Sequence, residues 1–337
     1  MSLWKCSILD DVEDKYLNYI PVLDCTDILK TYQIQAVLQG GGQAFIYKTS
    51  RMGHPFALKI MPADESKSAL GEIMIGCSLG PLVDNNISKA YLVPVGWRKC
   101  NILPPEKYLK GVSKMYLKGG YYYLVMPWAD YVLSTIKDDI DVSDYDILSM
   151  VFELLYGLVV ARFYFIGFSH NDIKAANIFV NNTLDARTYQ IEGHNFYIKS
   201  NLSAVLADFG QSYAIPVNEK LYGNTDLYGE YRPLSGRNDI PRLIDSFIST
   251  FPRSSLVPQL RELKTLLSAT DQGYQDYKTI INTLVTHKLF DRLKISKHVT
   301  GDNIINMVSW EDATKDPENN GPNNKNNENG DNKIESL

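Results

Sequence analysis

The chain has few cysteines, and they lie far apart in the sequence. Its 337 residues contain four, with no C-x-x-C pair among them: Cys6, Cys25, Cys77 and Cys100. This spacing suggests neither a zinc site nor a disulfide framework. We therefore expect reduced thiols and an intracellular protein, in the cytoplasm or the nucleus.

The sequence also lacks an excess of positive charge and any long apolar run. There are 34 lysines and arginines against 39 acids, and this net charge of −5 weighs against nucleic acid as a partner. The N-terminus meets four acids before any long apolar stretch, so we expect no signal or transit peptide. Without about 18 uninterrupted apolar residues, no membrane helix is expected either. The absence of self-similarity excludes a repeat array.

Composition divides the chain into unequal parts. Eight asparagines fall within Glu318–Asn332, so we predict a disordered tail over residues 311–337. Residues 1–31 form an N-terminal extension, the readable segments from Tyr32 to Trp128 are short and β-like, and from Asp146 onward the periodicity is helical. The predicted fold class is α+β, with a small β-rich part that contains one helix and a larger, mainly helical part.

Individual elements follow from the same periodicity. Strands are predicted at Ile34–Leu38, Ala44–Thr49, Phe56–Met61, Leu92–Trp97, Tyr121–Met126 and Ile178–Val180. Helices are predicted at Ser68–Leu79, Ile147–Phe165, Ile240–Thr250, Gln259–Ala269, Tyr274–His287 and Asp302–Trp310.

A glycine run and a lysine stand out in the β-rich part. Gly40, Gly41 and Gly42 lie between two β-like segments, where they could cradle phosphate with backbone N–H groups or form a plain hairpin turn. Lys59 is the one charged residue in an apolar strand pattern, so it must reach solvent or meet an anion. Glu72, on the predicted helix, could supply that anion or lie on a solvated face.

The sharpest signal is the segment F-S-H-N-D-I-K-A-A-N-I-F-V. It places His170, Asp172, Lys174 and Asn177 between a helix and a strand-like run, an arrangement that would be costly unless these groups meet charge. Asp208 ends a later apolar run in A-V-L-A-D-F-G, where an Asp-x-Gly could also be an ordinary turn.

Together, these motifs resemble the signature set of eukaryotic-type protein kinases. In chain order they are G-G-G-x-A-x-I-Y, A-L-K, a helix glutamate, H-N-D-I-K-x-x-N and D-F-G. The resemblance covers about Ile34 to Leu293 and implies a bilobal fold, with an N-lobe over 32–126 and a hinge and C-lobe over 127–310. It implies ATP and Mg²⁺ as cofactors. The lysine two residues after the aspartate is typical of serine/threonine kinases.

The resemblance assigns roles around the nucleotide. Lys59 would contact the α- and β-phosphates and be fixed by an ion pair with Glu72. Asn177 and Asp208 would hold Mg²⁺, which prefers oxygen ligands and keeps several waters.

Roles in phosphoryl transfer follow in the same way. Asp172 would accept the proton of the substrate hydroxyl, and Lys174 would neutralise charge on the transferring group. His170 is expected to support the loop by hydrogen bonding.

The adenine pocket is expected at the run Y-Y-Y-L-V-M-P-W-A. By the same resemblance, Met126 would take the gatekeeper position, Trp128 would lie in the hinge, and Phe179 would form the apolar floor. Ile46 or Tyr47 would be the ceiling. The register of the glycine loop stays open: Gly40 and Gly42 can be the paired glycines, or Gly41 the central one, and the second register favours Ile46.

The sequence also departs from the kinase pattern. Asn171 replaces the arginine that pairs with an activation-loop phosphate, so switching by that phosphorylation is not expected. Asn181–Ser203 is predicted to add an extended hairpin or loop. The A-P-E triplet is absent, and Gly229–Pro233 is the nearest similar segment. Asp239 resembles the helix aspartate that anchors the catalytic loop, and Q-G-Y-Q-D-Y-K-T-I-I is weakly similar to a helix of the casein-kinase-one and vaccinia-related groups.

Three hypotheses remain. The first is a monomeric serine/threonine protein kinase whose partners are protein substrates. The second is a small-molecule kinase of the choline or aminoglycoside type, which often carries H-N-D. The third is a pseudokinase scaffold, which the departures favour and the retained polar residues disfavour.

Overall fold

A computed structural model describes residues 25–40, 44–63, 68–108, 120–184, 186–216, 239–270, 277–296 and 304–306. All of them belong to one unit that spans Met1–Asn306. Several sequence predictions lie outside the described residues: most of the N-terminal extension, Gly41 and Gly42, the segment Gly229–Pro233, and the tail 311–337.

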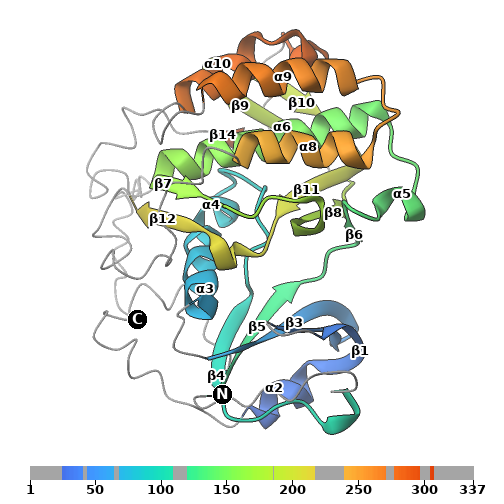
Figure 1. The fold of residues 1–337 in the computed structure, drawn as a ribbon, viewed down its shortest axis with the longest axis vertical. Helices are drawn as coiled ribbons and strands as arrows, with labels where there is room; N and C mark the ends of the chain where they lie inside the picture. Colours follow the sequence, from blue (N-terminus) through green and yellow to red (C-terminus); the bar gives the residue numbers. More distant parts are fainter. Residues whose placement is uncertain are drawn as a thin grey trace, which may run out of the picture. The chain divides into compact units, whose positions relative to one another are not determined.

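The N-terminal part is a five-stranded antiparallel sheet, in the order β1-β2-β3-β5-β4 (Figure 1). The strands are β1 (Gln33–Gly40), β2 (Phe45–Arg51), β3 (His54–Pro62), β4 (Gly96–Cys100) and β5 (Tyr121–Pro127). Four of the five predicted strands are confirmed within a few residues. The fourth begins at Gly96 rather than Leu92, because Leu92 instead donates its N–H to the Leu206 carbonyl (2.8 Å) and Pro94 has no N–H for a ladder.

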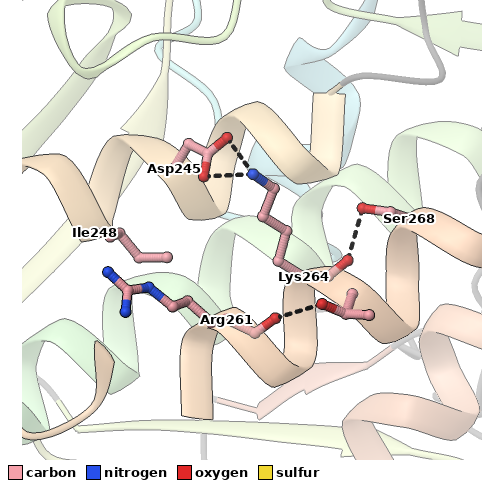
Figure 2. Close-up of a pocket in the computed structure, with 6 residues that line it drawn as sticks. Asp245, Ile248, Arg261, Lys264 and Ser268 are labelled. Carbon is pink, nitrogen blue, oxygen red and sulfur yellow. Dashed lines mark hydrogen bonds and ion pairs between the residues drawn. The ribbon is translucent and has the colours of Figure 1, made fainter. Parts of the chain in front are cut away.

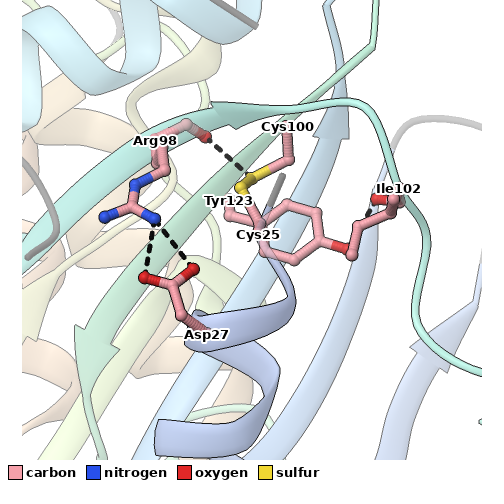
Figure 3. The surroundings of a disulfide bond; sticks show 6 residues. All are labelled: Cys25, Asp27, Arg98, Cys100, Ile102 and Tyr123. Atoms are coloured by element: carbon pink, nitrogen blue, oxygen red, sulfur yellow. Dashed lines mark hydrogen bonds and ion pairs between the residues drawn. A yellow bond between two sulfur atoms is a disulfide. The ribbon is translucent and has the colours of Figure 1, made fainter. Parts of the chain in front are cut away.

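One face of this sheet packs on α2 (Thr26–Thr31) around a disulfide. Cys25 and Cys100 are fully buried and bonded to each other, with Cα atoms 5.5 Å apart, so the expectation of reduced thiols is wrong for this pair (Figure 3). Beside it, Arg98 donates to the Asp27 carboxylate at 2.9 and 3.0 Å. No spacing in the sequence marks this pair, because 75 residues separate the two cysteines.

The sheet part contains more than the single predicted helix. The predicted helix is present as α3 (Ser68–Ser78), and α4 (Gly80–Asp84) follows it directly, with Pro81 in its first turn. Proline fits there because the first N–H groups of a helix have no partner within it.

The long helix α6 (Asp144–Tyr164) is the core of the following part. It begins three residues before the predicted start, because Ser143 and Asp146 form a reciprocal capping box. By length and composition it could cross a membrane, but 89% of its most apolar window is buried inside the protein, as expected of a core helix. The helices α8 (Asp239–Thr250) and α10 (Tyr277–Thr286) pack on α6, and α9 (Val257–Thr270) packs on α8 (Figure 1).

The part after β5 is less helical than predicted, because three small sheets lie among its helices. The strands are β6 (Tyr131–Val132), β7 (Phe165–Ser169), β8 (Ile178–Asn182), β9 (Arg187–Ile191), β10 (His194–Ile198), β11 (Leu202–Leu206), β12 (Tyr213–Pro216), β13 (Lys294–Ile295) and β14 (Ile304–Asn306). The short helix α5 (Ile136–Asp139) precedes α6. The predicted helix at Asp302–Trp310 is wrong where it is described, since β14 pairs in parallel with β9.

The predicted insertion Asn181–Ser203 contains the hairpin β9–β10, and a buried ion pair ties it to α6. Arg187 on β9 bonds to the Glu153 carboxylate on α6, and both side chains are at most 3% exposed. Tyr189 donates to Glu153 Oε1 (3.1 Å), and Arg187 Nη2 donates to the Leu202 carbonyl (3.0 Å). The order of helices and strands establishes the α+β class, with an antiparallel five-stranded sheet followed by mixed helices and strands.

Candidate functional site

Strand register places three of the predicted nucleotide residues on one face of the sheet. Lys59 lies opposite Ile46, and Ala57, two residues earlier on β3, lies opposite Met126. Directly opposed residues point to the same face, and residues two apart on a strand do so too. Ile46, Lys59 and Met126 therefore share a face. Tyr47 points the other way into the core and is fully buried, so of the two ceiling candidates only Ile46 lies on the Lys59 face.

Lys59 meets two carboxylates from different parts of the chain. Its Nζ lies 2.6 and 2.8 Å from the two oxygens of Glu72 on α3, and 2.8 Å from Oδ1 of Asp208. The side chains of Lys59 and Glu72 are 10% and 8% exposed, whereas that of Asp208 is 42% exposed. Asp208 itself has φ 65° and directly precedes the 3₁₀ turn η4 (Phe209–Gln211). The lysine is thus pinned between a buried and an accessible carboxylate.

This grouping sets the charge of the site. Burial by itself would lower the pKa of Lys59, but the Glu72 and Asp208 carboxylates outweigh it, and the pKa is raised. Burial would raise the pKa of Asp208, and the Lys59 ammonium more than offsets this, so that pKa is lowered. Burial raises the pKa of Glu72, against the opposing effect of Lys59. Lys59 is therefore cationic and Asp208 anionic at neutral pH.

A second cluster forms in the segment after β7. Asp172 Oδ2 accepts from Lys174 Nζ (2.6 Å) and from Asn177 Nδ2 (2.9 Å). Asn177 Nδ2 also donates to the Asp172 carbonyl (2.9 Å). Asn177 is the last residue of the 3₁₀ turn η3 (Ala175–Asn177). Asn177 is buried, whereas the Lys174 side chain is 54% exposed. The cluster thus combines a buried amide, a carboxylate and one solvent-accessible cation.

Hydrogen bonds join the two clusters. Ala207, the residue before Asp208, donates its N–H to the Asn177 carbonyl (3.1 Å), and its carbonyl lies 3.0 Å from His170 Nε2. Ser212 Oγ donates to the His170 carbonyl (3.1 Å). His170 is fully buried and supports the loop in the way predicted for it. The Asp172 segment and the Asp208 segment therefore form one hydrogen-bonded unit.

Asp239 holds this unit to α8. Its fully buried carboxylate accepts the backbone N–H groups of His170 (2.7 Å) and Asn171 (3.0 Å). Burial raises the pKa of Asp239, and His170 opposes that shift. The contact predicted from the resemblance, a helix aspartate bound to the loop backbone, is present.

Two side-chain oxygens of the site have no hydrogen-bond partner among the described residues, and they suit a hard cation. With Nδ2 of Asn177 engaged by Asp172, its Oδ1 accepts no hydrogen bond among the described residues, and the same holds for Oδ2 of Asp208. Amide and carboxylate oxygens are the ligands Mg²⁺ takes alongside water and phosphate. The described residues contain no group of three or more His, Cys, Asp or Glu suited to a metal, so such an ion would depend on phosphate for further ligands.

Two of the predicted adenine residues lie near this unit. Met126 and Phe179 both pack, half-buried, against a small apolar cluster that includes Ala207. Trp128 is half-buried, and Lys48 Nζ lies 4.6 Å from the centre of its ring. Gly40 pairs with Phe45 at the end of β1, and the glycines after it lie outside the described residues.

A surface groove elsewhere contains none of the predicted residues. It lies between α8 and α9, has a volume of about 640 Å³, and is lined by Asp245, Ile248, Arg261, Lys264, Thr265 and Ser268 (Figure 2). Lys264 Nζ bonds to both oxygens of Asp245 at 2.6 and 2.7 Å. The ion pair therefore neutralises part of the charge that lines the groove. The groove shares no lining residue with the Lys59 site.

Sequence reasoning did not identify Ser169, Ser212 and Arg242, which all bond to the loop before Asp172 or to its neighbours. Ser169 lies inside the F-S-H-N-D motif but was given no role there, and Ser212 and Arg242 lie outside the motifs with no spacing that could have marked them. A scan against protein-family models and a search of curated proteins both gave no match, so the interpretation depends on the residues and their geometry.

Proposed function

We propose that this protein is an ATP- and Mg²⁺-dependent protein kinase that transfers the γ-phosphoryl group to serine or threonine hydroxyls. One observation carries the proposal: Lys59, Glu72 and Asp208 meet within hydrogen-bond distance, although they lie on separate elements. The Asp172 cluster is bonded to the same segment through Ala207.

The chemistry of the site supports phosphoryl transfer. This reaction needs positioning and charge neutralisation more than covalent participation by the protein. Lys59 would bind phosphate oxygens, while Glu72 keeps its ammonium in place. Asp172 Oδ1, which accepts no hydrogen bond among the described residues, would take the hydroxyl proton as the substrate oxygen bonds to phosphorus and ADP leaves. The Lys174 side chain is exposed, so its ammonium would be able to neutralise the negative charge on the transferring phosphoryl group.

Mg²⁺ would be held by Asn177 and Asp208, whose remaining oxygens fit it. It would neutralise phosphate charge. The face that carries Ile46 and Met126, together with Phe179, would bind adenine through apolar contacts. The bilobal kinase fold belongs to the same proposal.

Partners and location remain predictions as well. We propose protein substrates, a monomer, and neither nucleic acid nor membrane as a partner. An intracellular location stays a prediction, although the Cys25–Cys100 disulfide is of a kind that is uncommon in the cytosol.

The test is transfer of label from γ-labelled ATP with Mg²⁺ to generic protein substrates, compared between wild type and Asp172→Asn. We expect incorporation into serine or threonine in the wild type and a loss of at least about 100-fold in the variant. The matched control is Asp138→Asn, an exposed aspartate on α5 whose carboxylate has no partner among the described residues.

The alternatives give different results. Label that enters only small amino alcohols or aminoglycosides would support a small-molecule kinase. A wild type that Mg²⁺-ATP does not stabilise thermally would support a scaffold, because a bound nucleotide must raise the unfolding temperature.

A further inference from the structure

Asn171, directly before Asp172, has a backbone conformation that few residues adopt. Its φ is 64°, in the left-handed region, and the residue is 7% exposed. Asparagine tolerates this region better than most side chains. Unusual backbone conformations persist where surrounding contacts impose them.

All four polar groups of Asn171 are engaged. Its N–H donates to Asp239 Oδ1 (3.0 Å), and its carbonyl accepts from Arg242 Nη1 (2.7 Å), both on α8. Its side-chain Nδ2 donates to the Gln211 carbonyl (2.8 Å), and its Oδ1 accepts from Ser169 Oγ. The residue therefore links β7, α8 and η4 at one point.

The Ser169 hydroxyl gives the side-chain amide a direction. Because Oδ1 takes the Ser169 O–H, the donor Nδ2 faces the carbonyl of Gln211, three residues after Asp208. The amide is thus a directional link between the segment that carries Asp172 and the segment that carries Asp208.

We propose that Asn171 is a positioning residue that holds Asp172 in register with Asp208 through its side-chain amide. The inference rests on the proposed kinase function and names how that site is assembled. A neutral amide that is bonded on both sides needs no anionic partner, so the link forms without phosphorylation of the segment beyond β12.

The main variant is Asn171→Asp. Aspartate has nearly the same size and also tolerates a positive φ, but it turns an oxygen toward the Gln211 carbonyl in place of the donor. We expect kcat to fall about 10- to 100-fold, because small errors in the position of a catalytic group are costly, while KM for ATP stays within about threefold. Stabilisation by Mg²⁺-ATP should be retained.

Two further variants guard against misfolding. Asn171→Gly keeps a backbone free to adopt φ 64° and removes both side-chain bonds, so it should lower kcat by a similar factor. Ser169→Ala removes only the hydroxyl that orients the amide and should lower kcat by about 3- to 10-fold. The matched control is Asn86→Asp, because Asn86 also has a positive φ (54°) but lies outside the site.

The outcomes separate the two proposals. Wild-type kcat in both Asn171 variants would overturn the positioning role and leave the kinase proposal intact. A fall in kcat matched by an equal rise in KM, with loss of Mg²⁺-ATP stabilisation, would also overturn it, because that pattern indicates a general structural role. A wild type with neither phosphotransfer nor Mg²⁺-ATP stabilisation would overturn the kinase proposal, and this inference with it.

Discussion

Removal of the Lys59 ammonium should destabilise the protein more than removal of any surface lysine. In Lys59→Met the buried Glu72 carboxylate loses its cation, with the Asp208 carboxylate close by. Removing one partner of a buried ion pair costs about 3–5 kcal/mol, because the other charge remains desolvated. The double variant Lys59→Met/Glu72→Met should recover most of this loss, since it removes the unpaired charge along with its partner.

A surface pair of the same geometry provides the control. Lys264 contacts both oxygens of Asp245 at distances like those of the Lys59 pair, but its side chain is 35% exposed and that of Asp245 is 53% exposed. Exposed pairs contribute about 0–1 kcal/mol. Lys264→Met should therefore lower the free energy of unfolding by less than about 1 kcal/mol.

The loss in Lys59→Met should also depend on pH. Burial already raises the pKa of Glu72, and the variant removes the ammonium that opposes this shift. A carboxyl group with a higher pKa in the folded state binds protons more tightly there, so stability falls as pH rises from the unfolded pKa, about 4.3, toward the folded one. The deficit should thus be largest at pH 7 and smaller at pH 5.

Urea unfolding of the wild type and the three variants at pH 7 and pH 5 measures both effects. The reasoning is refuted if Lys59→Met costs no more than Lys264→Met, or if its deficit grows on acidification.

Four further predictions address other parts of the molecule. Arg187→Met leaves the buried Glu153 unpaired and should lower the free energy of unfolding by about 3–5 kcal/mol, measured by urea denaturation; a loss below about 1 kcal/mol would contradict it. Removal of the Cys25–Cys100 disulfide in Cys25→Ala/Cys100→Ala should cost about 2–4 kcal/mol, measured by urea denaturation without reductant. Gly157→Ala should lower the thermal midpoint despite the better helix propensity of alanine, because the new Cβ would lie 2.4 Å from a neighbouring side chain. Under the proposed function, phosphatase treatment should leave phosphotransfer unchanged, and a loss of phosphotransfer would contradict the role inferred for Asn171.

Local periodicity was enough to predict most strands of the five-stranded sheet and the longer helices. The apolar strand pattern around Lys59 and the apolar run before Asp208 depend on neighbours in the chain, and both strands are present as β3 and β11. The motif residues were found in the same way, because each stands at a break in an apolar pattern. Their convergence was predicted only through the kinase resemblance.

The errors involve pairing between distant segments. Nothing in the few residues of β14 shows that they add to β9, so their apolar content was taken for a helix. The Cys25–Cys100 bond joins residues that no spacing rule connects. The buried Arg187–Glu153 pair was missed for the same reason, since each residue alone is typical of a solvated position.

The balance of hydrogen-bond donors and acceptors determines which kind of ligand the site attracts. Three donors of the loop have partners among the described residues: the backbone N–H groups of His170 and Asn171 donate to Asp239, and Nδ2 of Asn177 donates to Asp172. Three acceptors have none, because Oδ1 of Asp172, Oδ1 of Asn177 and Oδ2 of Asp208 all remain free there. A segment with spare oxygens and negative charge attracts a cation or a hydroxyl donor and repels a bare anion. This excess of acceptors favours phosphate that binds beside Lys59 together with a metal ion, and it supports Mg²⁺ in the proposed reaction.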